Sequence, residues 1–278
     1  MPLVGIATGA GRGMGRACAR RLAETVDALL LVDLDEVSLL EAATELRAAV
    51  EVTLIEPFLL DVTDSEGLAR LVSRVSELGT LRAVAHAAGI SPTMADWKRI
   101  LSVDLVGTAN LINALRPLAT DGTVIVCFAS MASLLALDDV DPAADLVIDA
   151  PEDDEFLERL HAVIGESIED TGFAYAWAKR GVQRLVKREA VRLGPAGSRI
   201  CSVSPGVIDT PQGRQEAESH PFMKELVERT PVGRREGRAE EVAAVVAFLM
   251  SDEASFVTGT DVLVDGGVCA ALRSPANS

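Results

Sequence analysis

The chain turns from strand to helix at Thr8-Gly9-Ala10-Gly11-Arg12-Gly13-Met14-Gly15, a glycine-rich stretch near its start. The apolar run from Leu3 to Thr8 has the length of a buried strand, and the segment from Met14 to Glu24 carries apolar residues at helical spacing. In a strand, loop and helix joined in this way, backbone amides and the helix N-terminus can face a pyrophosphate. Gly9, Gly13 and Gly15 lack the Cβ atoms that would hold chain and phosphate apart.

A glycine motif alone also fits an ordinary tight turn, but the next segments favour a phosphate loop. The run from Leu29 to Val32 predicts a buried strand that stops at Asp33, about twenty residues beyond the loop. Asp33 can accept hydrogen bonds from the ribose hydroxyls of NAD, and its charge would repel the extra phosphate of NADP. Leu34 stands where an arginine would favour NADP, although Arg12 places one cation in the loop. We therefore predict NAD as the cofactor.

Strand-like and helix-like segments then alternate without a Gly/Ser/Pro-rich linker, which predicts one domain over residues 1–278. The fold class expected is α/β, a single-domain Rossmann fold with a doubly wound, seven-stranded parallel sheet and helices on both faces. A helix is expected from Glu36 to Val50. The further strands are expected at Val52 to Leu60, Leu81 to Ala87, Thr123 to Phe128, Arg199 to Ser204 and Asp261 to Val264.

Two short segments follow strands of this pattern and are candidates for the cofactor site. Asp61-Val62 can meet the adenine ring, and Ala88-Gly89 follows the next strand along the chain. Either segment is equally compatible with a plain strand end.

Charge and composition exclude several classes of partner. The formal charge is −16, which would repel nucleic acid phosphates. Residues 1–8 are apolar but too short to span a membrane and lack a basic leader, so we expect a cytoplasmic protein without a membrane segment. The four cysteines are far apart in apolar surroundings and read as reduced core residues, so no metal site is expected.

The acidity is concentrated in residues 134–170, which hold 13 acidic residues and one basic residue, Arg159. This acidic stretch leads into an expected helix from Glu152 to about Ile168. Its apolar stripe must be buried. The stripe can pack onto the domain's own surface, which is the simplest possibility, or belong to a substrate lid or a subunit contact. The acids of the opposite face are expected in solvent. The stripe consists of Phe156, Leu157, Leu160, Val163 and Ile164.

Tyr175 and Lys179 are four residues apart, which places both on one face of a helix and predicts that both face one cleft. A tyrosine loses its proton only near pH ~10, so it needs a nearby cation to act as a base at neutrality. Lys179 would supply that charge. An isolated pair of this kind is usually a coincidence of an amphipathic helix, but this is the only tyrosine of the chain.

These residues, together with Ser130 and two glycine-containing segments near the C-terminus, resemble the short-chain dehydrogenase/reductase family over nearly the whole chain. The segments are Ser204-Pro205-Gly206-Val207-Ile208-Asp209-Thr210 and the ending Val257-Thr258-Gly259-Thr260-Asp261 to Val264-Asp265-Gly266-Gly267. The order and spacing of the motifs are far more specific than any one of them.

The resemblance implies that Tyr175 is the acid/base, that Lys179 lowers its pKa and binds the nicotinamide ribose, and that Ser130 positions the substrate oxygen. Ser133 is a nearby alternative, but Ser130 follows the expected strand directly and lies at its carboxyl edge. Thr210 matches a position that hydrogen-bonds the nicotinamide carboxamide. The residues implied in cofactor binding are Gly9, Arg12, Gly13, Met14, Gly15, Asp33, Leu34, Asp61, Val62, Ala88, Gly89, Tyr175, Lys179, Pro205, Gly206, Ile208 and Thr210.

The chain departs from the family's pattern at Asp104, in Val103-Asp104-Leu105-Val106-Gly107, where the family commonly has an asparagine that holds a water next to the lysine. Aspartate accepts from such a water but adds a charge, so the proton relay is either retuned or impaired. His86 and Ala87 stand where the family often has two asparagines. We expect His86 to be a strand-end residue and not a catalytic one.

The acidic insertion resembles that of a bacterial subgroup similar to 3α-hydroxysteroid dehydrogenase/carbonyl reductase, in which it blocks one helix–helix interface. This resemblance implies a homo-oligomer, and it favours a homodimer over the homotetramer that is common in the family. The expected activity is NAD-dependent interconversion of a secondary alcohol and a ketone on a hydrophobic cyclic or steroid-like substrate, under a lid at residues 211–232. Phe222, Met223, Leu226 and Val227 form either an apolar substrate wall or ordinary packing. Small cyclic or terpenoid alcohols, or a catalytically silent NAD(H)-binding sensor, are the alternatives.

Overall fold

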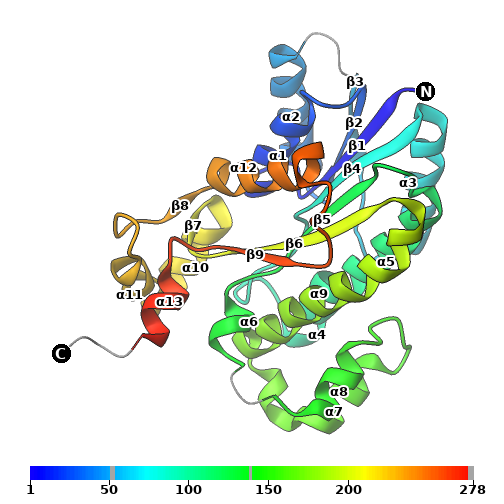
Figure 1. Cartoon of the computed structure of the whole chain (residues 1–278). Helices are drawn as coiled ribbons and strands as arrows, with labels where there is room; N and C mark the ends of the chain where they lie inside the picture. Colours follow the sequence, from blue (N-terminus) through cyan, green and yellow to red (C-terminus); the bar gives the residue numbers. More distant parts are fainter. Residues whose placement is uncertain (51–53, 138–139, 275–278) are drawn as a thin grey trace.

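Seven parallel strands form one sheet in the computed structural model, which describes residues 1–50, 54–137 and 140–274 (Figure 1). The strand order is β3-β2-β1-β4-β5-β6-β9, and it reverses between β1 and β4. A doubly wound sheet opens a ligand crevice at this reversal, beyond the carboxyl ends of its strands. The strands are β1 (Leu3–Thr8), β2 (Ala28–Asp33), β3 (Leu54–Leu59), β4 (Thr80–His86), β5 (Val124–Phe128), β6 (Arg199–Pro205) and β9 (Asp261–Val264).

The fold class predicted from the sequence is thereby confirmed, and each expected strand is present within one or two residues of its expected ends. Val52 and Thr53, at the start of one expected strand, lie outside the described residues.

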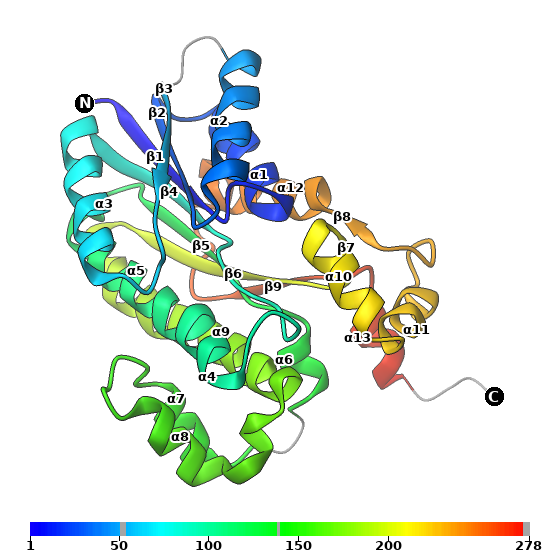
Figure 2. The ribbon, with the colours of Figure 1, turned by 180° about the vertical axis from the view of Figure 1, so that it is seen from behind.

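Helices cover both faces of the sheet (Figures 1 and 2). Neighbouring strand residues point to opposite faces, so Ile6 packs under α3, α5 and α9, while Ala7 packs under α1, α2 and α12. These helices are α1 (Gly13–Leu22), α2 (Glu36–Ala49), α3 (Ser65–Leu78), α5 (Gly107–Leu115), α9 (Thr171–Leu193) and α12 (Ala239–Met250).

Shorter elements connect the strands and the longer helices. They are α4 (Trp97–Leu101), the π-helical segment η1 (Ser102–Val106), η2 (Arg116–Leu118), α6 (Ala132–Leu135), η4 (Gly194–Ala196), β7 (Ile208–Asp209), α10 (Pro211–Ser219), α11 (Phe222–Arg229), β8 (Gly237–Arg238), η5 (Asp252–Ala254) and α13 (Val268–Arg273).

The acidic insertion differs from the single helix that the sequence predicts. It forms α7 (Pro142–Ile148), α8 (Phe156–Ile164) and the 3-10 turn η3 (Gly165–Glu169). Asp141 caps α7 by accepting from the amide of Ala143, and Pro142 suits the first helical position, so a helix begins there. Gly165, at φ 77°, ends α8 earlier than expected.

The apolar stripe of the insertion packs against the domain's own core, the simplest of the three possibilities. Phe156 and Leu160 are buried, and Leu157 and Ile164 pack against the same cluster. Only Val163 of the expected stripe is exposed.

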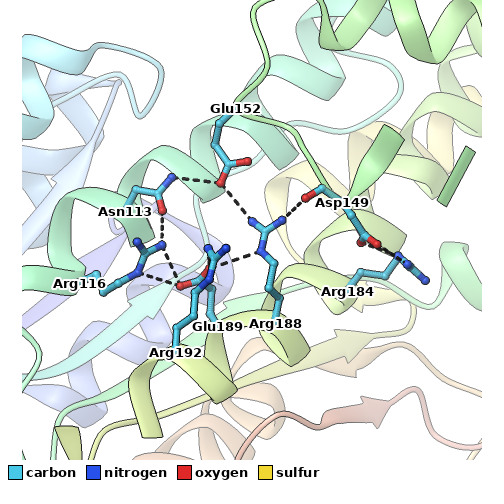
Figure 3. Close-up of polar contacts among 8 residues, drawn as sticks. All are labelled: Asn113, Arg116, Asp149, Glu152, Arg184, Arg188, Glu189 and Arg192. Carbon is cyan, nitrogen blue, oxygen red and sulfur yellow. Dashed lines mark hydrogen bonds and ion pairs between the residues drawn. The ribbon is translucent and has the colours of Figure 1, made fainter. Parts of the chain in front are cut away.

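Several acids of the insertion point inward, where they meet a row of arginines along α9 (Figure 3). The solvated face was expected for the helix from Glu152 onward, and Glu152 is exposed, whereas Asp145 and Asp149, which precede that helix, are half-buried. The arginines repeat every four residues, so they share one face of the helix. The contacts are Arg180 Nε to Asp145 Oδ1 at 2.7 Å, Arg184 Nε to Asp149 Oδ1 at 2.7 Å and Arg188 Nη2 to Glu152 Oε1 at 3.1 Å.

Glu189 is the buried centre of the same network, with a fully buried side chain 2.9 Å from Arg116 and 2.8 Å from Arg192. Removing one partner of a buried ion pair costs about 3–5 kcal/mol. The arginines keep access to water, so we expect Glu189→Ala to lower the free energy of unfolding by about 3 kcal/mol, the low end of that range. Urea denaturation checks this, with Glu158→Ala on the exposed face of α8 as the control. Equal stability of the two variants would contradict a structural role for Glu189.

Candidate active site

A cavity of about 710 Å³ lies along the carboxyl edge of the sheet and continues between α6, α9, α10 and α11. Apart from Lys179, every residue that the sequence assigns to cofactor binding lines it. These are Gly9, Arg12, Gly13, Met14, Gly15, Asp33, Leu34, Asp61, Val62, Ala88, Gly89, Tyr175, Pro205, Gly206, Ile208 and Thr210. Ser130 lines it as well.

The glycine-rich loop is shaped as a phosphate cradle. Gly9 has φ +63°, a left-handed conformation that favours glycine, and a Cβ at Gly15 would lie 2.1 Å from the carbonyl oxygen of Gly9. Helix α1 starts directly behind this turn, and Arg12 at its N-cap makes no capping hydrogen bond with its side chain. The first amides of α1 are thus left for an anion at the cavity wall.

Asp33 ends β2 with its carboxylate fixed in place. One oxygen accepts from the amide of Gly11 at 2.8 Å, and the other accepts from the amide of Asp35 at 3.0 Å. Each oxygen keeps a free lone pair for a ribose hydroxyl. Leu34 beside it is 63% exposed and offers no cation to a second phosphate. The residues present therefore fit a dinucleotide.

Asp61 and Val62 lie on the cavity wall, as the adenine interpretation requires. Burial would raise the pKa of Asp61, but hydrogen bonds from Thr63 and Arg99 outweigh it and lower the pKa. Arg99 Nη2 lies 2.7 Å from Asp61 Oδ2, and Arg99 lines the cavity too. The Asp61 carboxylate is therefore ionised and already engaged.

Tyr175 and Ser130 both line the wall of the cavity, and the side chain of Ser130 acts to lower the pKa of Tyr175. Ser130 follows β5, and α9 presents Tyr175 from the other side. Ser133, the alternative, is buried and donates its hydroxyl proton to the carbonyl of Ser130 at 2.9 Å. The geometry therefore favours Ser130 as the serine that reaches a substrate.

Lys179 lies behind this wall and does not line the cavity. The prediction that it faces the same cleft as Tyr175 is therefore wrong. Its Nζ is 5.3 Å from the centre of the Tyr175 ring and donates to the carbonyl of Phe128 at 3.2 Å. Asp104 Oδ2 is also 3.2 Å from this nitrogen, and the two side chains are 6% and 0% exposed. The lysine is held by a buried ion pair.

Asp104 owes its position to a local change of helix type. In η1 the amide of Gly107 bonds to the carbonyl of Ser102, five residues earlier, and such π-helical turns are frequent at functional sites. The amide of Ile90 donates to Asp104 Oδ1 at 2.8 Å. Asp104 is thus held with its second carboxylate oxygen next to Lys179.

This arrangement changes the proton affinity expected for Tyr175. Burial raises its pKa, the charge of Lys179 lowers it, and Asp104 and Glu216 raise it again. The net direction is upward because of burial, although Lys179 itself lowers the pKa as expected. Burial alone would lower the pKa of Lys179, but the attraction of Asp104 outweighs it and raises that pKa. The lysine stays charged, while Asp104 cancels part of its effect on the phenol.

His86 belongs to a buried hydrogen-bond chain behind the site. Thr108 donates to the carbonyl of Asp104 at 2.7 Å, so its oxygen accepts from His86 Nε2 at 2.9 Å. His86 Nδ1 then accepts from the hydroxyl of Thr8 at 2.8 Å. Burial and the charge of Lys179 lower the pKa of His86 to about 3. A neutral, fully bonded imidazole at a strand end has no free proton to exchange, as the sequence indicated.

The lid segment contributes both a wall and a packing surface. Phe222, Met223 and Leu226 line the cavity, while Val227 packs with Val268 in a separate apolar cluster. Sequence reasoning missed three polar residues of this segment that line the cavity: Gln212, and the pair Glu216 and His220. Their spacing of four on one helix was the available signal.

Within the described part of the chain, no group of three or more His, Cys, Asp or Glu side chains is placed to hold a metal ion. All four cysteines are free and buried. No described helix has the length and apolar character needed to cross a membrane.

Comparison with known proteins identifies the family. A family model described as enoyl-(acyl carrier protein) reductase matches residues 9–144 and 160–269. The unmatched residues 145–159 fall within the insertion. A short-chain type dehydrogenase/reductase from Mycobacterium ulcerans has the same fold, with a TM-score of 0.76 at 25% identity over 96% of this chain and 90% of that one.

Two relatives are named for cyclic alcohols. Cis-4-hydroxycyclohexanecarboxylate dehydrogenase of Sinomonas cyclohexanicum is 32% identical over 96% of both chains. Cyclohexanol dehydrogenase of Acinetobacter sp. (strain SE19) is 30% identical over 95% of this chain and 93% of its own. The 3-alpha-hydroxysteroid dehydrogenase/carbonyl reductase of Comamonas testosteroni, whose subgroup the insertion resembles, is 27% identical over 84% of this chain and 91% of its own.

The chain belongs to the short-chain dehydrogenase/reductase family. It is an oxidoreductase of alcohols that uses a nicotinamide dinucleotide.

Proposed function

We propose that the protein is an NAD-dependent dehydrogenase that interconverts a cyclic secondary alcohol and its ketone. The observation that carries this proposal is the Ser130–Tyr175 pair on the wall of one cavity whose other end is formed by the glycine-rich loop and Asp33. Relatives named for cyclohexanol and hydroxycyclohexanecarboxylate support a ring-shaped substrate. The apolar lid residues Phe222, Met223 and Leu226 suit such a ring.

The residues divide the reaction between them. In oxidation, Ser130 donates a hydrogen bond to the substrate oxygen, and Tyr175 takes the hydroxyl proton. NAD, when bound, supplies the acceptor for the hydride that leaves the carbinol carbon. Lys179 holds a positive charge behind the phenol, and Thr210, on the cavity wall, would hydrogen-bond the nicotinamide carboxamide.

The presence of Ser130 and Tyr175 on one cavity wall also supports an enzyme over a silent NAD(H)-binding sensor, which has no need of an acid/base pair. A panel of cyclohexanols, terpenoid alcohols and 3α-hydroxysteroids, oxidised with NAD at equal concentrations, tests the proposal. Turnover of small rings supports it, and turnover of steroids alone would move the substrate to the steroid class. Tight NADH binding without turnover of any alcohol would favour the sensor.

The oligomeric state, a homodimer or a homotetramer, stays a prediction, which sedimentation analysis would test.

The cofactor preference is expected to depend on Asp33. Bringing a second phosphate against its carboxylate costs free energy, so we expect kcat/KM for NAD to exceed that for NADP by about 30-fold or more. Asp33→Ser should remove most of this difference by weakening NAD use and tolerating NADP. Asp35→Asn, which also removes one charge at the cavity wall but keeps a capping side chain for α2, is the control. A preference for NADP in the unaltered protein would overturn the NAD assignment.

A further inference from the structure

Glu216 is a carboxylate without a partner on the wall of the catalytic cavity. The other described carboxylates lining the cavity are engaged: Asp33, Asp35 and Asp170 by backbone amides, and Asp61 by Thr63 and Arg99. Among the described residues, no hydrogen bond or ion pair involves the Glu216 side chain.

Helix α10 fixes the direction of this side chain. The helix starts at Thr210, whose hydroxyl oxygen accepts from the amide of Gly213 at 3.0 Å, so its first turn is tied to the residue next to the nicotinamide site. On this helix Glu216 is half-buried, whereas Glu218, two residues on, is exposed. Glu216 is close enough to the reacting phenol for its charge to raise the pKa of Tyr175.

The surroundings of Glu216 offer its carboxylate few hydrogen-bond donors. The nearby cavity wall is apolar, formed by residues such as Met131, Phe173, Met223 and Leu226. Burial raises the pKa of Glu216, while the charges of His220 and Lys179 lower it. Lys179 is already paired with Asp104, and His220 is exposed. A desolvated carboxylate without a donor is costly, so a donor is expected from whatever fills the cavity.

We propose that Glu216 determines substrate specificity by accepting a hydrogen bond from a second donor on the substrate, a hydroxyl or an ammonium group, and by repelling carboxylates. The proposal rests on the function proposed above. It separates this chain from its relative named for a hydroxycyclohexanecarboxylate, whose named substrate carries the charge that Glu216 would repel. The preferred substrate class is a cyclic alcohol with a second hydroxyl or an amine.

The test compares kcat/KM with NAD for four ring alcohols: cyclohexanol, 1,4-cyclohexanediol, 4-aminocyclohexanol and 4-hydroxycyclohexanecarboxylate. A hydrogen bond to a charged group predicts that the better of the two donor substrates exceeds the carboxylate by about 10-fold to 100-fold. Because the kcat/KM values of different substrates are compared within each variant, a general loss of activity cancels in their ratio. Glu216→Gln should abolish the preference for the amine over the carboxylate, and Glu216→Leu should also abolish any preference for the diol. Glu218→Gln, on the exposed side of α10, should leave all ratios unchanged.

The outcomes separate the two proposals. If cyclohexanol is oxidised but the ratios are the same in the unaltered protein and both Glu216 variants, the specificity role is wrong and the proposed function stands. If no alcohol is oxidised, the proposed function fails, and the same four compounds are then titrated calorimetrically into the NADH-saturated protein. A donor-bearing ring that binds at least 10-fold more tightly than the carboxylate, with the difference lost in Glu216→Gln, would still support the specificity role. Equal binding would overturn it.

Discussion

Replacing Tyr175 with phenylalanine is expected to lower kcat/KM for alcohol oxidation by about 10²-fold to 10⁴-fold, the usual contribution of a positioned acid/base. The substitution removes one oxygen atom from a half-buried ring and leaves its packing against Lys179 in place. Cofactor binding should survive, because the glycine-rich loop and Asp33 lie at the other end of the cavity. The loss should therefore appear in turnover and not in the Kd for NADH.

Steady-state kinetics and a fluorescence titration with NADH measure the two quantities on one preparation. Ser130→Ala should also lower turnover, whereas Ser133→Ala should change it little, because Ser133 is buried and bonds only to the backbone of Ser130. A Tyr175→Phe protein that retains turnover within threefold would remove Tyr175 from the chemistry.

Replacing Lys179 with methionine is expected to have the second largest effect, on both stability and activity. The substitution leaves the fully buried Asp104 with the amide of Ile90 as its remaining hydrogen-bond donor among the described residues. Breaking a buried ion pair predicts a loss of about 3–5 kcal/mol in the free energy of unfolding. Turnover should fall as well, since the phenol loses the positive charge of Lys179, which lowers its pKa.

The ion pair itself is tested by a double-mutant cycle with Asp104→Asn. The double variant buries no unpaired charge, so its stability loss should be smaller than the sum of the two single losses by about 1–3 kcal/mol. Its turnover should stay low, because the lysine is absent. Strict additivity of the two stability losses, measured by urea denaturation, would contradict the buried pair.

Asp104→Asn alone should also move the pH profile of oxidation. Oxidation needs the deprotonated phenol, so the rate falls as the pH drops through the pKa of Tyr175. Asp104 raises that pKa, and removing its charge while Lys179 stays protonated lowers it. The acidic limb of the profile should therefore shift to lower pH in Asp104→Asn. A shift to higher pH would mean that the lysine loses its proton instead.

The sequence was sufficient for the parts of the protein that depend on local pattern. Buried strands, the turn at Gly9 and the acidic strand end at Asp33 are each encoded in a few neighbouring residues, and parallel topology brings them to one edge of the sheet. The residues predicted for cofactor binding, apart from Lys179, therefore lie together on the wall of one cavity.

The parts that the sequence did not predict depend on contacts between distant segments. The arginines of α9 were visible at spacing of four, but their acidic partners lie in a different segment whose helices were misjudged at Pro142 and Gly165. The raised pKa of Tyr175 follows from burial and from Asp104 and Glu216, which come from two other helical segments. Helical spacing alone predicted Lys179 in the cleft. In the structure, its contacts with Asp104 and with the carbonyl of Phe128 hold it behind the cavity wall.

The most direct test of the central claim is hydride transfer from a labelled alcohol. The protein is incubated with NAD and cyclohexanol that carries deuterium at its carbinol carbon, and the reduced cofactor is analysed by mass spectrometry and NMR. We predict that deuterium appears on one face of the nicotinamide ring with the unaltered protein and that it is lost with Tyr175→Phe. Failure to form labelled NADH from this or any other cyclic secondary alcohol, with NAD binding confirmed, would contradict the proposed function.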